Sequence, residues 1–148
     1  ARDAFTVRAD GTDRVKLNGA LVSRRTVGEE VVWAPDGSRL IYYEYQFLAD
    51  TTDPLKDTFS VLPDGTGRVK LNSDTASQYS ASWSPDGSRL LYRVTDRSSQ
   101  RVTLGISRPD GTGLISIEEW NPGEGGPDYF RWVKGASRVA SDRPRGHR

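Results

Sequence analysis

The sequence contains no cysteine and only one histidine, and both shortages restrict the chemistry that the chain can perform. Without cysteine there is no disulfide, no thiolate nucleophile and no cysteine-based metal site. A hydrolase triad normally uses a positioned histidine as its base. His147 is the penultimate residue, where we expect a solvated side chain. We therefore predict no catalytic residue in this chain.

Charge of one sign and long apolar runs are also lacking. The formal net charge of +1 creates no strong field for nucleic acid, and no apolar run approaches the length that crosses a bilayer. We predict neither nucleic-acid binding nor membrane insertion. Basic residues gather only near the end, where residues 131–148 hold six Lys or Arg and one Asp. We interpret 143–148 as a frayed basic tail rather than a contact for an acidic partner.

Turn-forming and aromatic residues, in contrast, are well represented. The 148 residues include 15 Gly, 8 Pro, 4 Trp, 6 Tyr and 4 Phe. The length is that of one ordinary domain, and the composition is typical of a small β-protein with many turns.

Two strings alternate along the chain. The first, Trp-Ser-Pro-Asp-Gly-Ser-Arg-Leu, stands at residues 83–90, has one substitution at 33–40, and is degenerate at 132–139. Its tryptophans lie 50 and 49 residues apart. The second string contains Asp-Gly-Thr and stands at residues 9–18, 63–72 and 109–118. Four short strands in a repeat of this length are the signature of a β-propeller blade.

Each Asp-Gly pair lies between two β-rich runs, which predicts a hairpin turn. Aspartate hydrogen-bonds the turn backbone, and glycine takes the left-handed conformation that the turn requires. This favours a structural role over a carboxylate array for the repeated turn residues Asp36, Gly37, Asp64, Gly65, Asp86, Gly87, Asp110 and Gly111.

The two strings resemble the repeat of the TolB-type β-propeller family, with its WD-repeat-like blades. The same repeat occurs in the propeller domains of prolyl-oligopeptidase-like enzymes. The resemblance implies an all-β fold for residues 1–142, with antiparallel blades of strands a to d and the tryptophan on the innermost strand. It places strands c and d of a partial blade at 4–18, complete blades at 30–72 and 79–118, and strands a and b of another partial blade at 128–140.

The two partial blades are complementary, because strands c and d at the start and strands a and b at the end make one blade together. A ring of three blades is too small, since propellers have about four to eight. Two explanations stay open. Either two copies close a six-blade ring head to tail, or a longer chain supplies the missing blades.

Connection lengths predict which face of the blades binds a partner. The a–b and c–d turns are short and share one face, whereas the connections on the other face vary: Gly37 and Gly65 lie 28 residues apart, but Gly87 and Gly111 lie 24 apart. Loops on a rigid scaffold commonly carry binding residues. From the loops 46–57 and 119–129 we select as candidates Phe47, Asp50, Asp53, Trp120, Glu124 and Tyr129.

Four of these candidates, Trp120, Tyr129, Asp50 and Asp53, have an alternative interpretation. Trp120 and Tyr129 are suited to contact a protein partner, or they pack inside the fold. Asp50, Asp53 and Asp57 offer oxygen ligands of the kind calcium takes, but their spacing favours solvated loop acids, so we predict no metal and no cofactor. The pairs Glu29–Glu30 and Glu118–Glu119, expected where strands meet loops, leave a two-carboxylate glycosidase open.

These observations favour a non-enzymatic scaffold that binds a protein or peptide through the long-loop face or the central channel. Two alternatives are the propeller portion of a larger enzyme, such as an oligopeptidase-like hydrolase, and a propeller that binds a sugar or another small molecule. The resemblance implies the bacterial envelope, periplasmic or secreted, with the cytoplasm as the other option.

Overall fold

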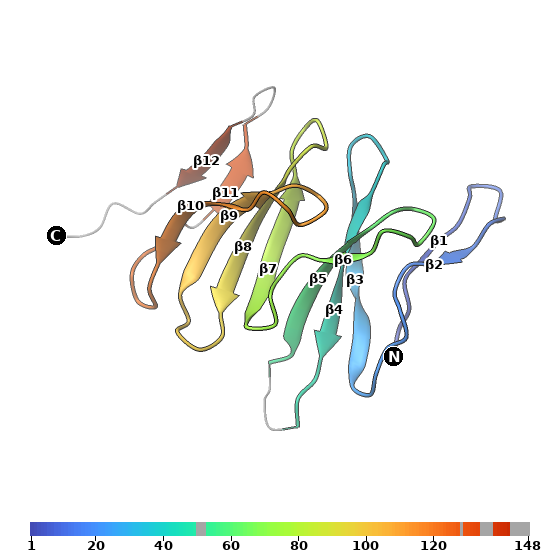
Figure 1. The fold of residues 1–148 in the computed structure, drawn as a ribbon, viewed down its shortest axis with the longest axis horizontal. Helices are drawn as coiled ribbons and strands as arrows, with labels where there is room; N and C mark the ends of the chain where they lie inside the picture. Colours follow the sequence, from blue (N-terminus) through green and yellow to red (C-terminus); the bar gives the residue numbers. More distant parts are fainter. Residues whose placement is uncertain (50–52, 128, 134–137, 143–148) are drawn as a thin grey trace. The chain divides into compact units, whose positions relative to one another are not determined.

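The computed structural model describes residues 1–49, 53–127, 129–133 and 138–142 (Figure 1). Within these ranges the chain is all-β and has no helix. The strands, in chain order, are β1 (Phe5–Thr6), β2 (Val15–Lys16), β3 (Arg25–Trp33), β4 (Leu40–Gln46), β5 (Leu55–Val61), β6 (Val69–Lys70), β7 (Ala76–Trp83), β8 (Leu90–Asp96), β9 (Val102–Ser107), β10 (Ile115–Trp120), β11 (Tyr129–Trp132) and β12 (Val139–Asp142).

The chain divides into two compact units, Ala1–Ser73 and Asp74–Arg148. The first unit holds the hairpin β1–β2 and a four-stranded sheet in the order β3-β4-β5-β6. The second holds a four-stranded sheet made of β7, β8, β9 and β10, and the hairpin β11–β12. All neighbouring strands are antiparallel. The all-β prediction of four-stranded antiparallel blades is therefore confirmed.

Strand ends differ from the ranges expected from the repeat. The inner strands begin earlier, β3 at Arg25 instead of residue 30 and β7 at Ala76 instead of residue 79. Both continue past a bulge to keep pairing with the next strand. In β3 the bulge begins at Gly28, where a Cβ atom would lie 2.7 Å from Cε2 of Tyr45. Glycine thus lets the tyrosine ring lie against the bulged backbone.

The aspartate carboxylate stabilises each Asp-Gly turn by accepting hydrogen bonds from it. The Oδ1 atom of Asp36 accepts hydrogen bonds from the backbone nitrogen of Ser38 at 3.0 Å and from its hydroxyl at 2.7 Å. The same pair of bonds recurs at Asp10, Asp64, Asp86 and Asp110. Hydrogen bonds to the charged form lower the pKa of all five carboxyl groups. The glycine that follows each one has a φ between 70° and 83°.

Each unit has its own apolar core. In the first unit the core joins the hairpin β1–β2 to the sheet and contains Ala4, Leu17, Val27, Leu40, Tyr42, Phe59 and Val61. The rings of Tyr42 and Phe59 stack with centroids 5.6 Å apart. In the second unit Leu91, Val102, Leu104 and Trp120 are buried together. Burial of each large apolar side chain contributes about 1.5–3 kcal/mol.

The asparagine of the repeated string Lys-Leu-Asn forms hydrogen bonds that connect paired strands in the first unit. Asn72 accepts a hydrogen bond from the backbone nitrogen of Thr58 at 2.8 Å and donates one to Asp57 at 3.0 Å. Asn18 does the same with the backbone of Ala4 and the carboxylate of Asp3. Each asparagine follows a d strand and therefore ties that strand to the c strand beside it. Among the described residues, no helix is long and apolar enough to cross a membrane.

Candidate functional site

A groove of about 580 Å³ lies where the long connections of the first unit meet. The β2–β3 and β4–β5 connections are joined there by a hydrogen bond of 2.9 Å from the backbone nitrogen of Phe47 to the carbonyl oxygen of Arg24. We call this site the long-loop groove; its lining includes Leu21, Val22, Arg24, Arg25, Thr26 and Phe47. Of the binding candidates that the structure describes, Phe47 lines the groove.

The long-loop groove combines exposed apolar surface with a cation. The side chains of Phe47 and Val22 are 49% and 63% exposed. Arg24 is also exposed and forms no ion pair with a described residue. Its φ is +63°, in the left-handed region that a long side chain rarely adopts. Strained backbone of this kind concentrates at binding sites. Arg24 is therefore a further candidate binding residue, which we did not select from the sequence.

The second unit repeats the backbone arrangement with other side chains. There the nitrogen of Arg97 donates to the carbonyl oxygen of Thr75 at 2.9 Å. Arg97 therefore holds the position that Phe47 holds in the first unit. The exposed aromatic side chain is thus a departure from the repeat rather than a requirement of the blade.

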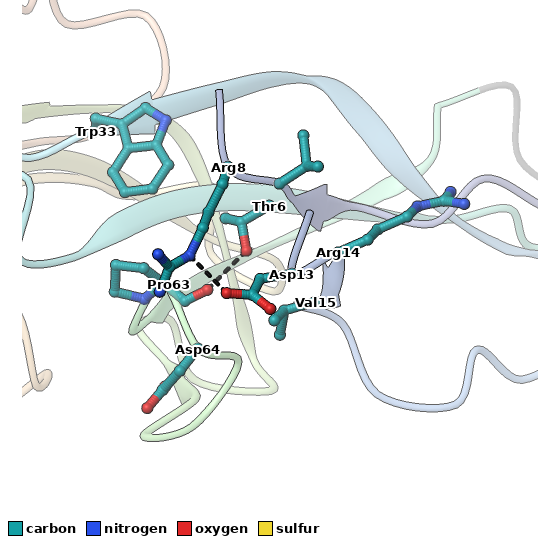
Figure 2. Close-up of a pocket in the computed structure, with 9 residues that line it drawn as sticks. Thr6, Arg8, Asp13, Arg14, Val15, Trp33, Pro63 and Asp64 are labelled. Atoms are coloured by element: carbon teal, nitrogen blue, oxygen red, sulfur yellow. Dashed lines mark hydrogen bonds and ion pairs between the residues drawn. The ribbon is translucent and has the colours of Figure 1, made fainter. Parts of the chain in front are cut away.

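A second hollow, of about 570 Å³, lies at the tight-turn end of the first unit (Figure 2). The hydroxyl of Thr6 donates to the carbonyl oxygen of Pro63 at 2.7 Å, and Nε of Arg8 lies 2.5 Å from Oδ2 of Asp13. The indole of Trp33 forms another wall. We call this site the tight-turn hollow. It lies at the opposite end of β4 from Phe47, and none of its residues was among the binding candidates.

Trp120 lies in the core rather than on a surface that a partner could reach. Its side chain is 6% exposed, and the guanidinium of Arg93 lies 5.4 Å from the ring centroid. A Cβ atom on Gly126 would lie only 2.1 Å from Cε2 of the indole. The ring is therefore covered by the loop after β10, and a contact with a partner would require that loop to move.

The remaining candidates are divided between the two units. Asp53 is exposed in the first unit, and Glu124 is exposed in the second. One carboxylate oxygen of Glu124 accepts a hydrogen bond of 2.8 Å from the backbone nitrogen of Asn121, which closes a local turn. Asp50 lies outside the described residues. Tyr129 begins β11, but its side chain lies outside what the structure describes.

The interpretation of Asp57 as a loop acid is wrong, because it lies inside β5 and is 2% exposed. Its carboxylate is 3.1 Å from Nζ of Lys70 and 3.1 Å from a guanidinium nitrogen of Arg25. Burial alone would raise the pKa of Asp57. The hydrogen bonds from Asn72 and Lys70 and the nearby cationic charges outweigh burial and lower the pKa below its ordinary value.

The same buried network includes Glu44 on β4. Its carboxylate is 2.7 Å from Arg68 and 3.4 Å from Arg25. Arg68 also donates to the hydroxyl of Tyr42 at 2.6 Å and stacks over the ring of Phe59 at 3.7 Å. Burial raises the pKa of Tyr42 to about 12. These contacts hold the sheet together and leave the carboxylates enclosed.

Both glutamate pairs lie within strands, not where strands meet loops as expected. Glu29 and Glu30 are exposed on the bulge of β3, where Glu29 forms an ion pair with Arg2. In β10, Glu119 forms an exposed ion pair of 3.0 Å with Arg101. Glu29 and Glu30 lie in the bulge of β3, which sequence patterning did not indicate, whereas the bulge of β10 lies at Ile117, just before the second pair. Among the described residues, no three His, Asp or Glu side chains are grouped to hold a metal ion.

The blades define the chain as a β-propeller-type protein, and two solved structures share this architecture. One, solved as "putative TolB" from Agrobacterium tumefaciens, superposes with a TM-score of 0.52 and 14% identity over 80% of this chain and 42% of that one. The other is an oligogalacturonate lyase in complex with manganese, with a TM-score of 0.56 and 16% identity over 84% of this chain and 31% of that one.

At these identities the likeness establishes the propeller-type fold alone. The chain spans less than half the length of either neighbour. Neither a protein-family model nor a curated protein matches the sequence.

Proposed function

We propose that this chain is part of a non-enzymatic binding module of the TolB type, and that the long-loop groove takes a peptide segment of a protein partner. The observation that carries this proposal is the exposure of Phe47 and Val22 in one groove beside the cation of Arg24. Large aromatic and arginine side chains commonly dominate binding energy at protein interfaces. A bacterial envelope location fits the TolB-like neighbour.

The groove favours a partner segment with an apolar side chain next to a carboxylate. An apolar side chain gains about 25 cal/mol for each Å² of apolar surface that it removes from water. A guanidinium pairs with a carboxylate in a planar, two-pronged geometry, which fixes orientation as well as charge. A lysine next to the apolar side chain would instead meet Arg24 with like charge.

A peptide array tests this with the full chain as the probe. The peptides carry a central Leu or Phe flanked either by Glu or by Lys. We expect the Glu series to bind, and Phe47→Ala and Arg24→Ala each to weaken binding about tenfold. Arg97→Ala is the matched control, because this residue has the same backbone place in the second unit.

Two results would contradict the proposal. Equal binding of the Glu and Lys series would show that the cation does not select the partner. Binding that survives Phe47→Ala but is lost in Arg97→Ala would move the site to the second unit.

The propeller portion of a larger enzyme is the second candidate function. It is supported by the lyase neighbour, of which this chain covers only 31%. In that case the catalytic groups stand on sequence beyond these 148 residues. An intact mass of the natural protein far above 16.4 kDa would favour the enzyme, and a mass near this value would exclude it.

We also propose that the two-stranded hairpins β1–β2 and β11–β12 find complementary strands, either in a second copy or in a longer chain. Each hairpin is half of a four-stranded blade. Light scattering of the 148-residue chain distinguishes the two. A stable dimer, at twice 16.4 kDa, supports closure by two copies, and a monomer or an aggregate opposes it.

A further inference from the structure

The tight-turn hollow contains an aromatic side chain that is exposed although its repeat equivalent is not. Trp33 is 47% exposed, whereas Trp83, which holds the same place in the repeat, is 9% exposed. Figure 2 shows the indole near Pro63 and the Arg8 side chain, while the Arg14 side chain extends away from them. The volume of about 570 Å³ falls within the range of about 300–1,000 Å³ typical of small-ligand sites.

The hollow also contains a carboxylate at a position where the repeat has glycine. Asp13 has a φ of +50°, and the matching residues of the other two copies are Gly67 at +59° and Gly113 at +62°. A side chain in this conformation costs stability that glycine avoids. Retained strain at a cavity wall suggests that the carboxylate serves a ligand.

The polar groups of the hollow offer donors and acceptors without an excess of either charge. Arg8 neutralises Asp13, while the guanidinium of Arg14 lies 3.8 Å from the ring centroid of Phe5 and the carboxylate of Asp64 accepts hydrogen bonds within its own turn. Arg8 pairs with Asp13 through Nε, which leaves its two terminal nitrogens as further hydrogen-bond donors. The hydroxyl of Thr6 donates to Pro63, which leaves its oxygen able to accept.

We propose that the tight-turn hollow is a second binding site, distinct from the long-loop groove, and that it takes one ring of a neutral saccharide. A pyranose ring has an apolar C–H face, which matches the exposed indole of Trp33. Its hydroxyl groups both donate and accept hydrogen bonds, which matches the paired Arg8 and Asp13. Because the lining charges balance, a charged ligand would lose hydration without gaining a net opposite charge.

The experiment uses the full chain labelled with ¹⁵N and follows the indole N–H signals of its four tryptophans. The probes are maltose, cellobiose and lactose, with glucuronate as the charged comparison. We expect at least one neutral disaccharide to shift the Trp33 signal saturably, with a dissociation constant in the millimolar range. Glucuronate should bind about tenfold more weakly or not at all. Trp33→Phe assigns the signal.

Asp13→Gly separates a binding role from a structural one. This variant introduces the residue that the other repeats carry and removes the strain of a side chain at positive φ, but it also removes an exposed ion pair with Arg8. Its melting temperature should therefore stay within about 2 °C of that of the unchanged chain. Saccharide affinity should nevertheless fall about tenfold, as it should in Trp33→Ala. Phe47→Ala, which changes an exposed aromatic residue of the long-loop groove, should leave the affinity unchanged.

Four outcomes would overturn the proposal. The Trp33 signal stays unchanged with every neutral probe, glucuronate binds more tightly than the neutral sugars, affinity survives both Trp33→Ala and Asp13→Gly, or Phe47→Ala abolishes binding. The first three do not bear on peptide binding at the long-loop groove, and the fourth would assign the saccharide to that groove, so the two proposals fail separately.

Discussion

Glu44 and Asp57 face each other across β4 and β5, and a single arginine serves both carboxylates. One guanidinium nitrogen of Arg25 lies 3.4 Å from Glu44 and 3.1 Å from Asp57. Both acidic side chains are 4% exposed. Two carboxylates in such surroundings repel each other and lose hydration, so their stability depends on the shared cation.

Arg25→Met should therefore destabilise the first unit although it keeps most of the aliphatic stem. We expect a loss of about 2 kcal/mol, below the roughly 3–5 kcal/mol of a fully broken buried pair, because Arg68 and Lys70 remain. Urea unfolding measures this loss. Arg2→Met is the control: its ion pair with Glu29 is exposed, so it should cost less than about 1 kcal/mol. Equal losses would mean that the buried network adds nothing.

The pH dependence of unfolding should contain a contribution from Asp57. Its pKa is lower in the folded chain than the ordinary value of 3.8. The stabilisation is therefore present above about pH 4 and is lost as the pH falls through 3.8 toward the folded pKa. Urea unfolding between neutral pH and about pH 3 should show this loss, and Asp57→Asn should flatten the curve there while lowering stability at neutral pH. An unchanged slope in the variant contradicts the assignment.

Local turn chemistry was predictable from the sequence, whereas the partners of Asp57 were not. The Asp-Gly turns depend on hydrogen bonds that span two residues, such as that from Ser38 to Asp36. Asp57, by contrast, is satisfied by Arg25 and Lys70, which approach it only after the strands have paired. Its polar neighbourhood in the sequence therefore indicated a solvated loop, and only sheet register shows otherwise.

One feature of the tight-turn hollow could be predicted from the sequence, and another could not. Alignment of the three Asp-Gly-Thr strings places Asp13 where the other copies have Gly67 and Gly113, so a comparison of repeats alone could have found it. The exposure of Trp33 could not have been found in this way. The same string surrounds Trp83, which is 9% exposed, and packing rather than local sequence decides the difference.

Two adjacent glycines should respond in opposite ways to alanine. A methyl group on Gly126 would overlap the buried ring of Trp120, with 2.1 Å to its nearest atom. We expect Gly126→Ala to cost about 1–3 kcal/mol through overpacking. A methyl group on Gly125 would meet nothing within 4 Å, so Gly125→Ala should stay within about 0.5 kcal/mol. Thermal unfolding compares the two, and a harmless Gly126→Ala would show that the loop does not cover the indole.

The two complete copies of the Trp-bearing string differ at one position, and this position should set the acidity of the turn carboxylate. Ser84 donates its hydroxyl to Asp86 at 2.6 Å, whereas the first repeat has Ala34 in its place. This hydrogen bond is the largest cause of the lowered pKa of Asp86, about 2. Ser84→Ala should raise that pKa toward the ordinary 3.8, and carboxyl ¹³C titration measures it. The stabilisation that this turn provides, present above pH 3.8 and lost toward about pH 2, would then shrink.

Asp96, whose pKa is also about 2 but which accepts hydrogen bonds from other serines, is the internal reference, and its pKa should not change. A stationary Asp86 would show that the backbone bond from Ser88 lowers its pKa without the hydroxyl.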